Sequence, residues 1–122
     1  MSSKHFRLDE HKIEASHIRS FPRALSTHEN DVLHLAVKQY TPLNNPNPQD
    51  GDVTIIAAHA NAFPKELYEP LWDDLLQRSQ KFGFRIRSIW IADVVHQGHS
   101  SVLNEDKLGN DRKILCTVIL ST

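Results

Sequence analysis

A chain of 122 residues is long enough for one small domain and too short for two. Hydrophobic residues make up 39% of the chain and charged residues 24%, as in ordinary soluble globular domains. The formal net charge is -1, and no cluster of lysine and arginine stands out, which argues against a nucleic-acid partner. Cys116 is the only cysteine, so an internal disulfide is excluded and a reducing compartment is expected.

The two ends of the sequence carry no recognisable targeting signal. Residues 1–7 are polar and mixed in charge, unlike a secretory signal. The apolar stretch 114–120 is far too short to span a bilayer, so no membrane partner is expected. The final residues Leu-Ser-Thr differ from a peroxisomal tripeptide of the Ser-Lys-Leu type. We therefore expect a soluble intracellular chain.

The first part of the chain predicts two strands and two loops. Polar and apolar residues roughly alternate over residues 6–18, which is typical of an exposed edge strand. Residues 20–31 are rich in turn formers and predict a loop. Alternation returns over residues 32–40, and Pro42 is expected to lie beyond the end of this strand because proline cannot donate to the ladder. Residues 43–52, rich in asparagine and proline, predict a second loop.

Two apolar runs predict strands that are buried on both faces of a parallel sheet. The first covers residues 53–58 and the second residues 85–93. The helical pattern between them is about 17 residues long, so the three elements form a βαβ unit with a right-handed crossover. We expect the two strands to be parallel neighbours.

A leucine repeat predicts the intervening helix over residues 65–81. Leu67, Leu71 and Leu75 recur every four residues and are expected to form the stripe that packs on the sheet. Gly83 is expected to end the helix. The polar residues expected to face water are Lys65, Glu66, Glu69, Asp73 and Arg78.

The last part of the chain has weaker patterns. Residues 94–111 predict a polar loop without clear periodicity, and residues 114–120 predict one more short strand. The expected fold class is therefore α/β, a mixed sheet with an antiparallel N-terminal pair and a parallel βαβ core.

The segment with the clearest chemistry is the turn that follows the first apolar strand, His59-Ala60-Asn61-Ala62-Phe63. Its position places backbone N–H groups at the carboxyl edge of a parallel sheet, the usual ligand site of open α/β folds. A developing oxyanion could accept hydrogen bonds from such groups. Phe63 could line a pocket at the same edge.

This turn resembles the oxyanion-hole segment of the α/β-hydrolase family. In that family a strand ends in a His-Gly-like turn before the first core helix, and His59-Ala60-Asn61 matches it with Ala60 in place of the glycine. The resemblance implies that the N–H of Asn61 is an oxyanion donor and that His59 shapes the turn. The family's next strand ends in an aspartate, followed by a loop with spaced glycines and a serine. Asp93 and the residues up to Ser100 fit this form with one extra residue and with His99 in place of a glycine.

A closer resemblance, carried by residues 59–72 and 90–110, is to fungal α/β-hydrolases. Some of these belong to secondary-metabolite and host-selective-toxin clusters, which implies toxin biosynthesis and virulence, and several are peroxisomal. The resemblance runs from about residue 6 to residue 111, and the tail 112–122 diverges. The family's nucleophile, catalytic acid and catalytic histidine come later than this region. The sequence thus predicts one partial domain over residues 1–122, an incomplete α/β-hydrolase fold.

Ser100 lies in a sequence that begins like the Gly-x-Ser-x-Gly nucleophile elbow, Gly98-His99-Ser100-Ser101-Val102. The position two after the serine must be very small, and here it is Val102. No predicted strand leads directly into Gly98. We therefore interpret Ser100 as a decoy and assign no catalytic residue.

The eight histidines raise the question of a metal site. His96 and His99 are three residues apart, but zinc requires three or four ligands at defined spacing, and a solvated loop is the favoured interpretation. We expect neither a metal nor a cofactor. For His59, a hydrogen-bonded structural role is favoured over that of a general base.

Three functional hypotheses remain open. The first is a truncated hydrolase-like protein whose full-length relatives cleave an ester, thioester or lactone by serine acyl transfer. The second is a non-catalytic remnant that binds a partner or a small acyl ligand, and the third is a non-functional truncated gene product. The resemblance implies a peroxisomal location, with the cytoplasm as the alternative. We also expect strand 53–58 to leave an apolar sheet edge open for self-association, unless residues 114–120 cover it.

Overall fold

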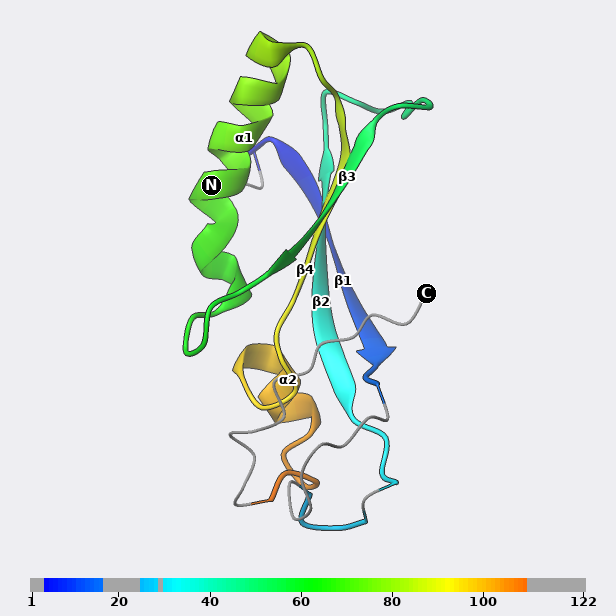
Figure 1. Cartoon of the computed structure of the whole chain (residues 1–122), viewed down its shortest axis with the longest axis vertical. Helices are drawn as coiled ribbons and strands as arrows, with labels where there is room; N and C mark the ends of the chain where they lie inside the picture. Colours follow the sequence, from blue (N-terminus) through cyan, green and yellow to red (C-terminus); the bar gives the residue numbers. More distant parts are fainter. Residues whose placement is uncertain (1–3, 17–24, 29, 110–122) are drawn as a thin grey trace. The chain divides into compact units, whose positions relative to one another are not determined.

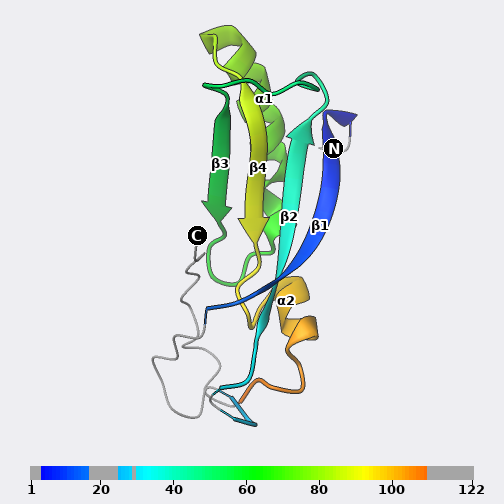
Figure 2. The ribbon, with the colours of Figure 1, turned by 90° about the vertical axis from the view of Figure 1, so that its right-hand side faces the viewer.

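A computed structural model of the chain describes residues 4–16, 25–28 and 30–109. The elements in chain order are β1 (Phe6–Glu14), β2 (His34–Pro42), β3 (Val53–Ala58), the 3-10 helix η2 (Lys65–Tyr68), α1 (Glu69–Phe82), β4 (Ile86–Ala92) and α2 (Gly98–Leu103). The strands form one sheet in the order β1-β2-β4-β3 (Figures 1 and 2). None of the helices within these ranges is long and apolar enough to cross a bilayer.

The described residues fall into two compact units. The first contains residues 4–11 and 38–92, and the second contains residues 12–16, 25–28, 30–37 and 93–109. The turn after β3 belongs to the first unit, and the segment that follows β4 belongs to the second.

The sheet is mixed, as the sequence predicts. β3 and β4 are parallel, with Cα partners from Val53 and Ile86 to Ala58 and Ala92. The N–H of Leu43 donates to the carbonyl of His5 (2.9 Å), next to the end of β2 and the start of β1, respectively. The N–H of Ala15 donates to the carbonyl of Leu33 (2.8 Å), next to the opposite ends of the same strands. β1 and β2 are therefore antiparallel, which confirms the N-terminal pair.

The core of the first unit lies between α1 and the sheet, along which the helix runs (Figure 1). It is centred on Trp72, which is 4% exposed and stacks with Tyr68 at a centroid distance of 6.2 Å. Burying an aromatic side chain of this size contributes roughly 3 kcal/mol or more to folding. The buried core side chains are Phe6, Tyr40, Trp72, Leu76, Ile86, Ile89 and Ile91.

The helix buries a different stripe from the one predicted. Leu67 is 57% exposed and Leu71 is 52% exposed, so the leucine stripe was wrong at both positions. The α-helix starts only at Glu69, because residues 65–68 form a 3-10 turn, in which each residue rotates further about the axis than in an α-helix. The stripe facing the sheet is centred one residue later, on Trp72, Leu76 and Ser79. Gly83 ends the helix in the left-handed region with φ 74°, as predicted.

β3 is more exposed than its apolar sequence predicts. Val53 is 41% exposed and Ile56 is 67% exposed, so the prediction of burial on both faces was wrong. The reason is position: β3 is the last strand in the sheet order, and within the described ranges β4 is its only neighbour. Ile55 and Ala57 point to the other face and pack against the core.

The segment after β4 contains a helix where a loop was predicted. α2 spans Gly98–Leu103, too short for an apolar repeat to show in the sequence. β2 also starts and ends two residues later than predicted and includes Pro42 as its last residue. Residues 17–18 of the first predicted strand, the predicted strand 114–120 and Cys116 lie outside the described residues.

Candidate functional site

The turn that follows β3 has a strained backbone. The N–H of Phe63 donates to the carbonyl of Ala60 (3.1 Å), which closes a four-residue turn. Ala62, the third residue, has φ 68°, in the left-handed region that costs a non-glycine residue roughly 1–2 kcal/mol. Such strain persists where the surrounding structure enforces it, and it is common at sites that bind ligands.

Two side chains fix the conformation of Ala60 in this turn. Its N–H donates to the phenol oxygen of Tyr68 (2.8 Å). Its carbonyl lies 2.9 Å from Nδ1 of His59, and because a carbonyl can only accept, Nδ1 carries the proton. The amide of Ala60 is thus occupied, and Asn61 supplies the next N–H along the chain. Sequence reasoning placed His59, Ala60 and Asn61 at this turn and considered Tyr68 only as a residue that could line a pocket, without predicting its bond to Ala60.

Phe63, the predicted pocket residue, is 49% exposed at the end of the turn. One hollow of about 240 Å³ in the first unit lies at the other end of α1, between its C-terminus and the start of β4. Its lining includes Ser79, Gly83 and Arg85 but not Phe63. This hollow is therefore separate from the turn.

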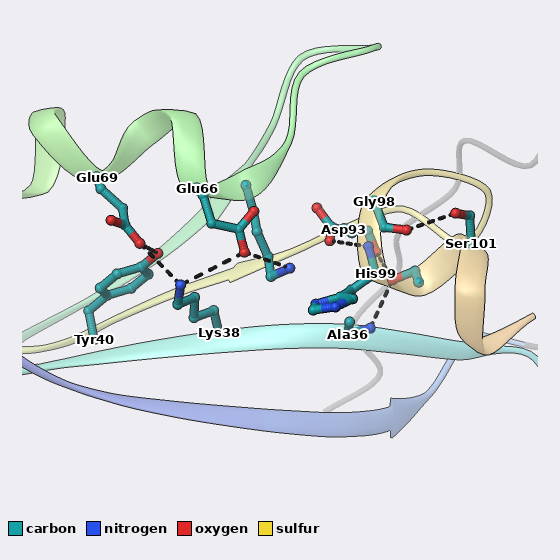
Figure 3. A network of polar contacts seen from close by, with 11 residues as sticks. Ala36, Lys38, Tyr40, Glu66, Glu69, Asp93, Gly98, His99 and Ser101 are labelled. Carbon is teal, nitrogen blue, oxygen red and sulfur yellow. Dashed lines mark hydrogen bonds and ion pairs between the residues drawn. The ribbon is translucent and has the colours of Figure 1, made fainter. Parts of the chain in front are cut away.

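The helix start that follows the turn is anchored by a group of buried and half-buried charges (Figure 3). The ammonium of Lys65 lies 3.0 Å from a carboxylate oxygen of Glu66. Lys38 on β2 lies 3.1 Å from Glu69 and 3.8 Å from Glu66. The hydroxyl of Tyr40 donates to the same oxygen of Glu69 (3.0 Å). Two lysines and two glutamates balance in charge, which burial of ionised groups requires.

Lys65 was predicted to face water, and that prediction was wrong, since it is 1% exposed. The sequence contains one usable signal for this burial: Glu66 and Glu69 follow it within one turn and can neutralise it. The group of charged residues connects η2 and the start of α1 to β2. The end of the turn that follows β3 is thereby held against the sheet.

The second unit contains the segment that resembles a nucleophile elbow. Asp93 is 1% exposed and accepts the N–H of His99 on its carboxylate (3.0 Å). Ser100 is fully buried, donates its hydroxyl proton to the carbonyl of Asp93 (2.7 Å) and accepts the N–H of Ala36 (2.8 Å). A hydroxyl held in this way links the segment after β4 to β2 and exposes no oxygen that could attack an ester.

Asn104 is the central polar residue of the second unit, and sequence reasoning missed it. It is 1% exposed, and its amide nitrogen donates to the carbonyls of His34 (2.7 Å), Ser100 (2.8 Å) and Val95 (2.9 Å). Its side-chain oxygen accepts the N–H of His34 (2.7 Å). Burial lowers the pKa of His34 below its usual value, and Lys12 and Lys107 act in the same direction.

The histidines do not converge on a metal site in the part of the chain that the structure describes. No group of three or more histidine, cysteine or acidic side chains there could hold a metal ion. His11 instead bonds to Gln39 (2.9 Å) and stacks on Trp90 at a centroid distance of 5.1 Å.

Comparison with known proteins gives relatives of the chain but no matching family model. The sequence is 51% identical over 112 residues to the type I acyl-CoA thioesterase mpaH of Penicillium roqueforti. It is 47% identical over 111 residues to the type I acyl-CoA thioesterase mpaH' of Penicillium brevicompactum. Each match covers 91% of this chain, which spans only 25% of the length of either relative.

A solved structure with the same fold is the peroxisomal α/β-hydrolase Lpx1 of Saccharomyces cerevisiae. The TM-score is 0.71 at 21% sequence identity, over 86% of this chain and 29% of that protein. The chain therefore has the fold of part of an α/β-hydrolase, as its resemblance predicted, and it is related in sequence to fungal acyl-CoA thioesterases.

Proposed function

We propose that this chain supplies the oxyanion turn of an α/β-hydrolase that cleaves a small acyl thioester. The observation that carries this proposal is the strained turn at the carboxyl end of β3, held by Tyr68 through the amide of Ala60. The N–H of Asn61 is the donor that the family resemblance implies. The thioester substrate class is supported by the two acyl-CoA thioesterases to which the sequence is related.

The proposed role is electrostatic. When a nucleophile adds to the thioester carbonyl, the carbonyl oxygen gains a negative charge that fixed N–H groups can stabilise. Loss of one such donor typically lowers kcat by about 10²–10³-fold. Within the described residues the serine most like a nucleophile is Ser100, whose hydroxyl is buried and occupied. We therefore assign the chain the oxyanion turn and not the nucleophile.

The proposed setting is fungal secondary-metabolite biosynthesis, including toxin biosynthesis. The relatives from Penicillium support a fungal acyl-thioester pathway, and the fold shared with a peroxisomal hydrolase supports a peroxisomal location. Non-catalytic binding of an acyl ligand at the same turn is the alternative function. Its support is the exposure of Phe63 beside the turn.

A polypeptide of these 122 residues should show no esterase or thioesterase activity above background. Oxyanion donors alone have no tetrahedral intermediate to stabilise. The measurement is hydrolysis of short acyl p-nitrophenyl esters and acyl-CoA, together with labelling by a fluorophosphonate probe. The Ser100→Ala variant is the control and should behave like the parent. Activity or labelling that disappears in that variant would make Ser100 the nucleophile and overturn the assignment.

We also expect this polypeptide to self-associate through β3. The edge carries only apolar residues and Thr54, and it lacks the lysine or proline that natural edges use against pairing. Ile56→Lys places a charge at a position that is 67% exposed, so it should convert oligomer to monomer without unfolding the chain. Leu43→Lys, at a loop position that is 57% exposed, is the matched control and should leave association unchanged.

Size-exclusion chromatography with light scattering at equal concentrations measures this association. A variant without residues 114–122 is measured in the same way and compared with the parent chain. Stronger association after the deletion would support coverage of the edge by these residues, and an unchanged profile would count against it. A parent chain that is monomeric at every concentration, with or without the deletion, would contradict the association itself.

A further inference from the structure

We infer that the phenol hydroxyl of Tyr68 is a second oxyanion donor, which acts beside the N–H of Asn61. The inference rests on the proposed function and adds a side chain to a site so far composed of backbone. Tyr68 lies at the end of η2, and its oxygen is 2.8 Å from the amide nitrogen of Ala60. It would therefore touch the reacting oxygen and is proposed as a catalytic residue.

The hydrogen-bond arrangement at Tyr68 leaves a proton to donate. A phenol has one donor proton and can accept through its oxygen. The oxygen accepts the N–H of Ala60, and no described residue accepts the hydroxyl proton. A hydroxyl that accepts one hydrogen bond becomes a stronger donor of another, since the chain of bonds is polarised in one direction. An anion at the turn would accept the hydroxyl proton of Tyr68 and so continue the series of hydrogen bonds that begins at the N–H of Ala60.

The ring of Tyr68 is held in place by the core of the first unit. It stacks on Trp72 with an interplanar angle of 24°, and Trp72 is 4% exposed. Trp72 in turn contacts Tyr40 at a centroid distance of 6.4 Å. A donor fixed by packing before the substrate arrives needs no reorganisation as charge develops, which is the condition for strong oxyanion stabilisation.

The step can be written without a proton leaving Tyr68. As the nucleophile bonds to the carbonyl carbon, the electron pair of the C=O π bond moves onto oxygen, and that oxyanion accepts hydrogen bonds from Tyr68 and Asn61. When the intermediate collapses, the pair returns to re-form the C=O bond and the thiolate leaves with the electrons of the C–S bond. The hydroxyl keeps its proton throughout.

The experiment uses hexylphosphonate as a tetrahedral anion and follows backbone amide signals of the ¹⁵N-labelled chain by NMR. The sequence contains only two tyrosines, so Tyr40→Phe leaves Tyr68 as the single phenol. In this background Tyr68→Phe removes the hydroxyl, and biosynthetic 3-fluorotyrosine replaces Tyr68 alone. Fluorination makes the hydroxyl a better donor and its oxygen a poorer acceptor. Titrations are carried out well below the pH at which the fluorophenol ionises.

Donation by Tyr68 predicts saturable shifts of the Ala60 and Asn61 amides when the hydroxyl is present. It also predicts binding about tenfold weaker in the Tyr68→Phe variant, which loses a hydrogen bond to a charged group. Fluorination should tighten binding. If fluorination weakens binding, Tyr68 acts only as an acceptor that positions the turn, and the inference is wrong. Equal binding by the Tyr68→Phe variant also overturns it and leaves the proposed Asn61 site intact. An absence of any shift at Asn61 in the parent chain would count against the proposed function as well.

Discussion

The Asn104→Asp variant is expected to lose about 4 kcal/mol of stability in the second unit. The exchange keeps the shape of the side chain but replaces the amide nitrogen by a second acceptor oxygen, which then faces the carbonyls of His34, Ser100 and Val95. The carbonyl of Ser100 keeps the backbone N–H of residue 104 as a donor. Each buried carbonyl that is left without a donor costs roughly 1–3 kcal/mol, and the buried charge adds to that penalty. The bond from the N–H of His34 survives, so the effect is specific to the lost donors.

This effect has a defined pH dependence. The pKa of the new carboxyl is raised in the folded state, because the surrounding carbonyls favour the protonated form. The folded state then binds the proton more tightly than the unfolded state, so the deficit relative to the parent chain should shrink as the pH falls. Hydrogen exchange of the backbone N–H of residue 104, which donates to the carbonyl of Ser100, measures the stability of the unit in both chains. Asn44→Asp, at an exposed loop position, is the control, and an equal loss in both variants would contradict this account.

Gly98→Ala should destabilise the same unit by about 3 kcal/mol. Gly98 has φ 52°, which costs an alanine roughly 1–2 kcal/mol. Its added Cβ would also lie 2.4 Å from a carboxylate oxygen of Asp93. Asp93 is buried and accepts the N–H of His99, so it cannot move away without losing that bond, a further cost of about 1–3 kcal/mol.

The Gly51→Ala variant separates the cost of the backbone conformation from the cost of the contact with Asp93. Gly51 also has a positive φ, 94°, but an added Cβ there meets no atom within 4 Å. The control should therefore show the backbone cost alone, and Gly98→Ala should exceed it by the cost of displacing Asp93. Urea denaturation followed by far-UV circular dichroism measures both variants, and hydrogen exchange of α2 measures the loss in the second unit for Gly98→Ala. Equal losses in the two variants would show that the contact with Asp93 carries no energy.

The features that could be predicted from sequence are those whose signal is local and repeated. The apolar runs of β3 and β4 predicted a parallel pair, because unbroken β-branched and aliphatic residues suit few other arrangements. Gly83 predicted the end of α1 through a backbone conformation that glycine adopts without strain. The turn at His59 was identified by family resemblance together with its place between strand and helix.

Most features that could not be predicted depend on residues far apart in the chain. Asn104 looks like a loop residue until His34, 70 positions earlier, is seen to supply its partners. Lys65 has a carboxylate partner beside it in the sequence, Glu66, but no periodicity predicts the 3-10 turn in which Lys65 becomes buried. The apolar residues of β3 predict burial, but the exposure of a strand also depends on its place in the sheet. β3 is the last strand in the sheet order, which its own residues do not indicate.

The central claim, that this chain supplies a working oxyanion turn, is tested most directly in a chimera. The segment of the Penicillium roqueforti thioesterase that aligns over 112 residues would be replaced by the matching residues of this chain, and kcat for acyl-CoA hydrolysis measured. We predict that the chimera retains activity within about tenfold of the parent thioesterase. Asn61→Pro, which removes the proposed donor proton, should lower kcat by about 10²–10³-fold. A folded chimera without activity, or one that Asn61→Pro leaves unchanged, would contradict the claim.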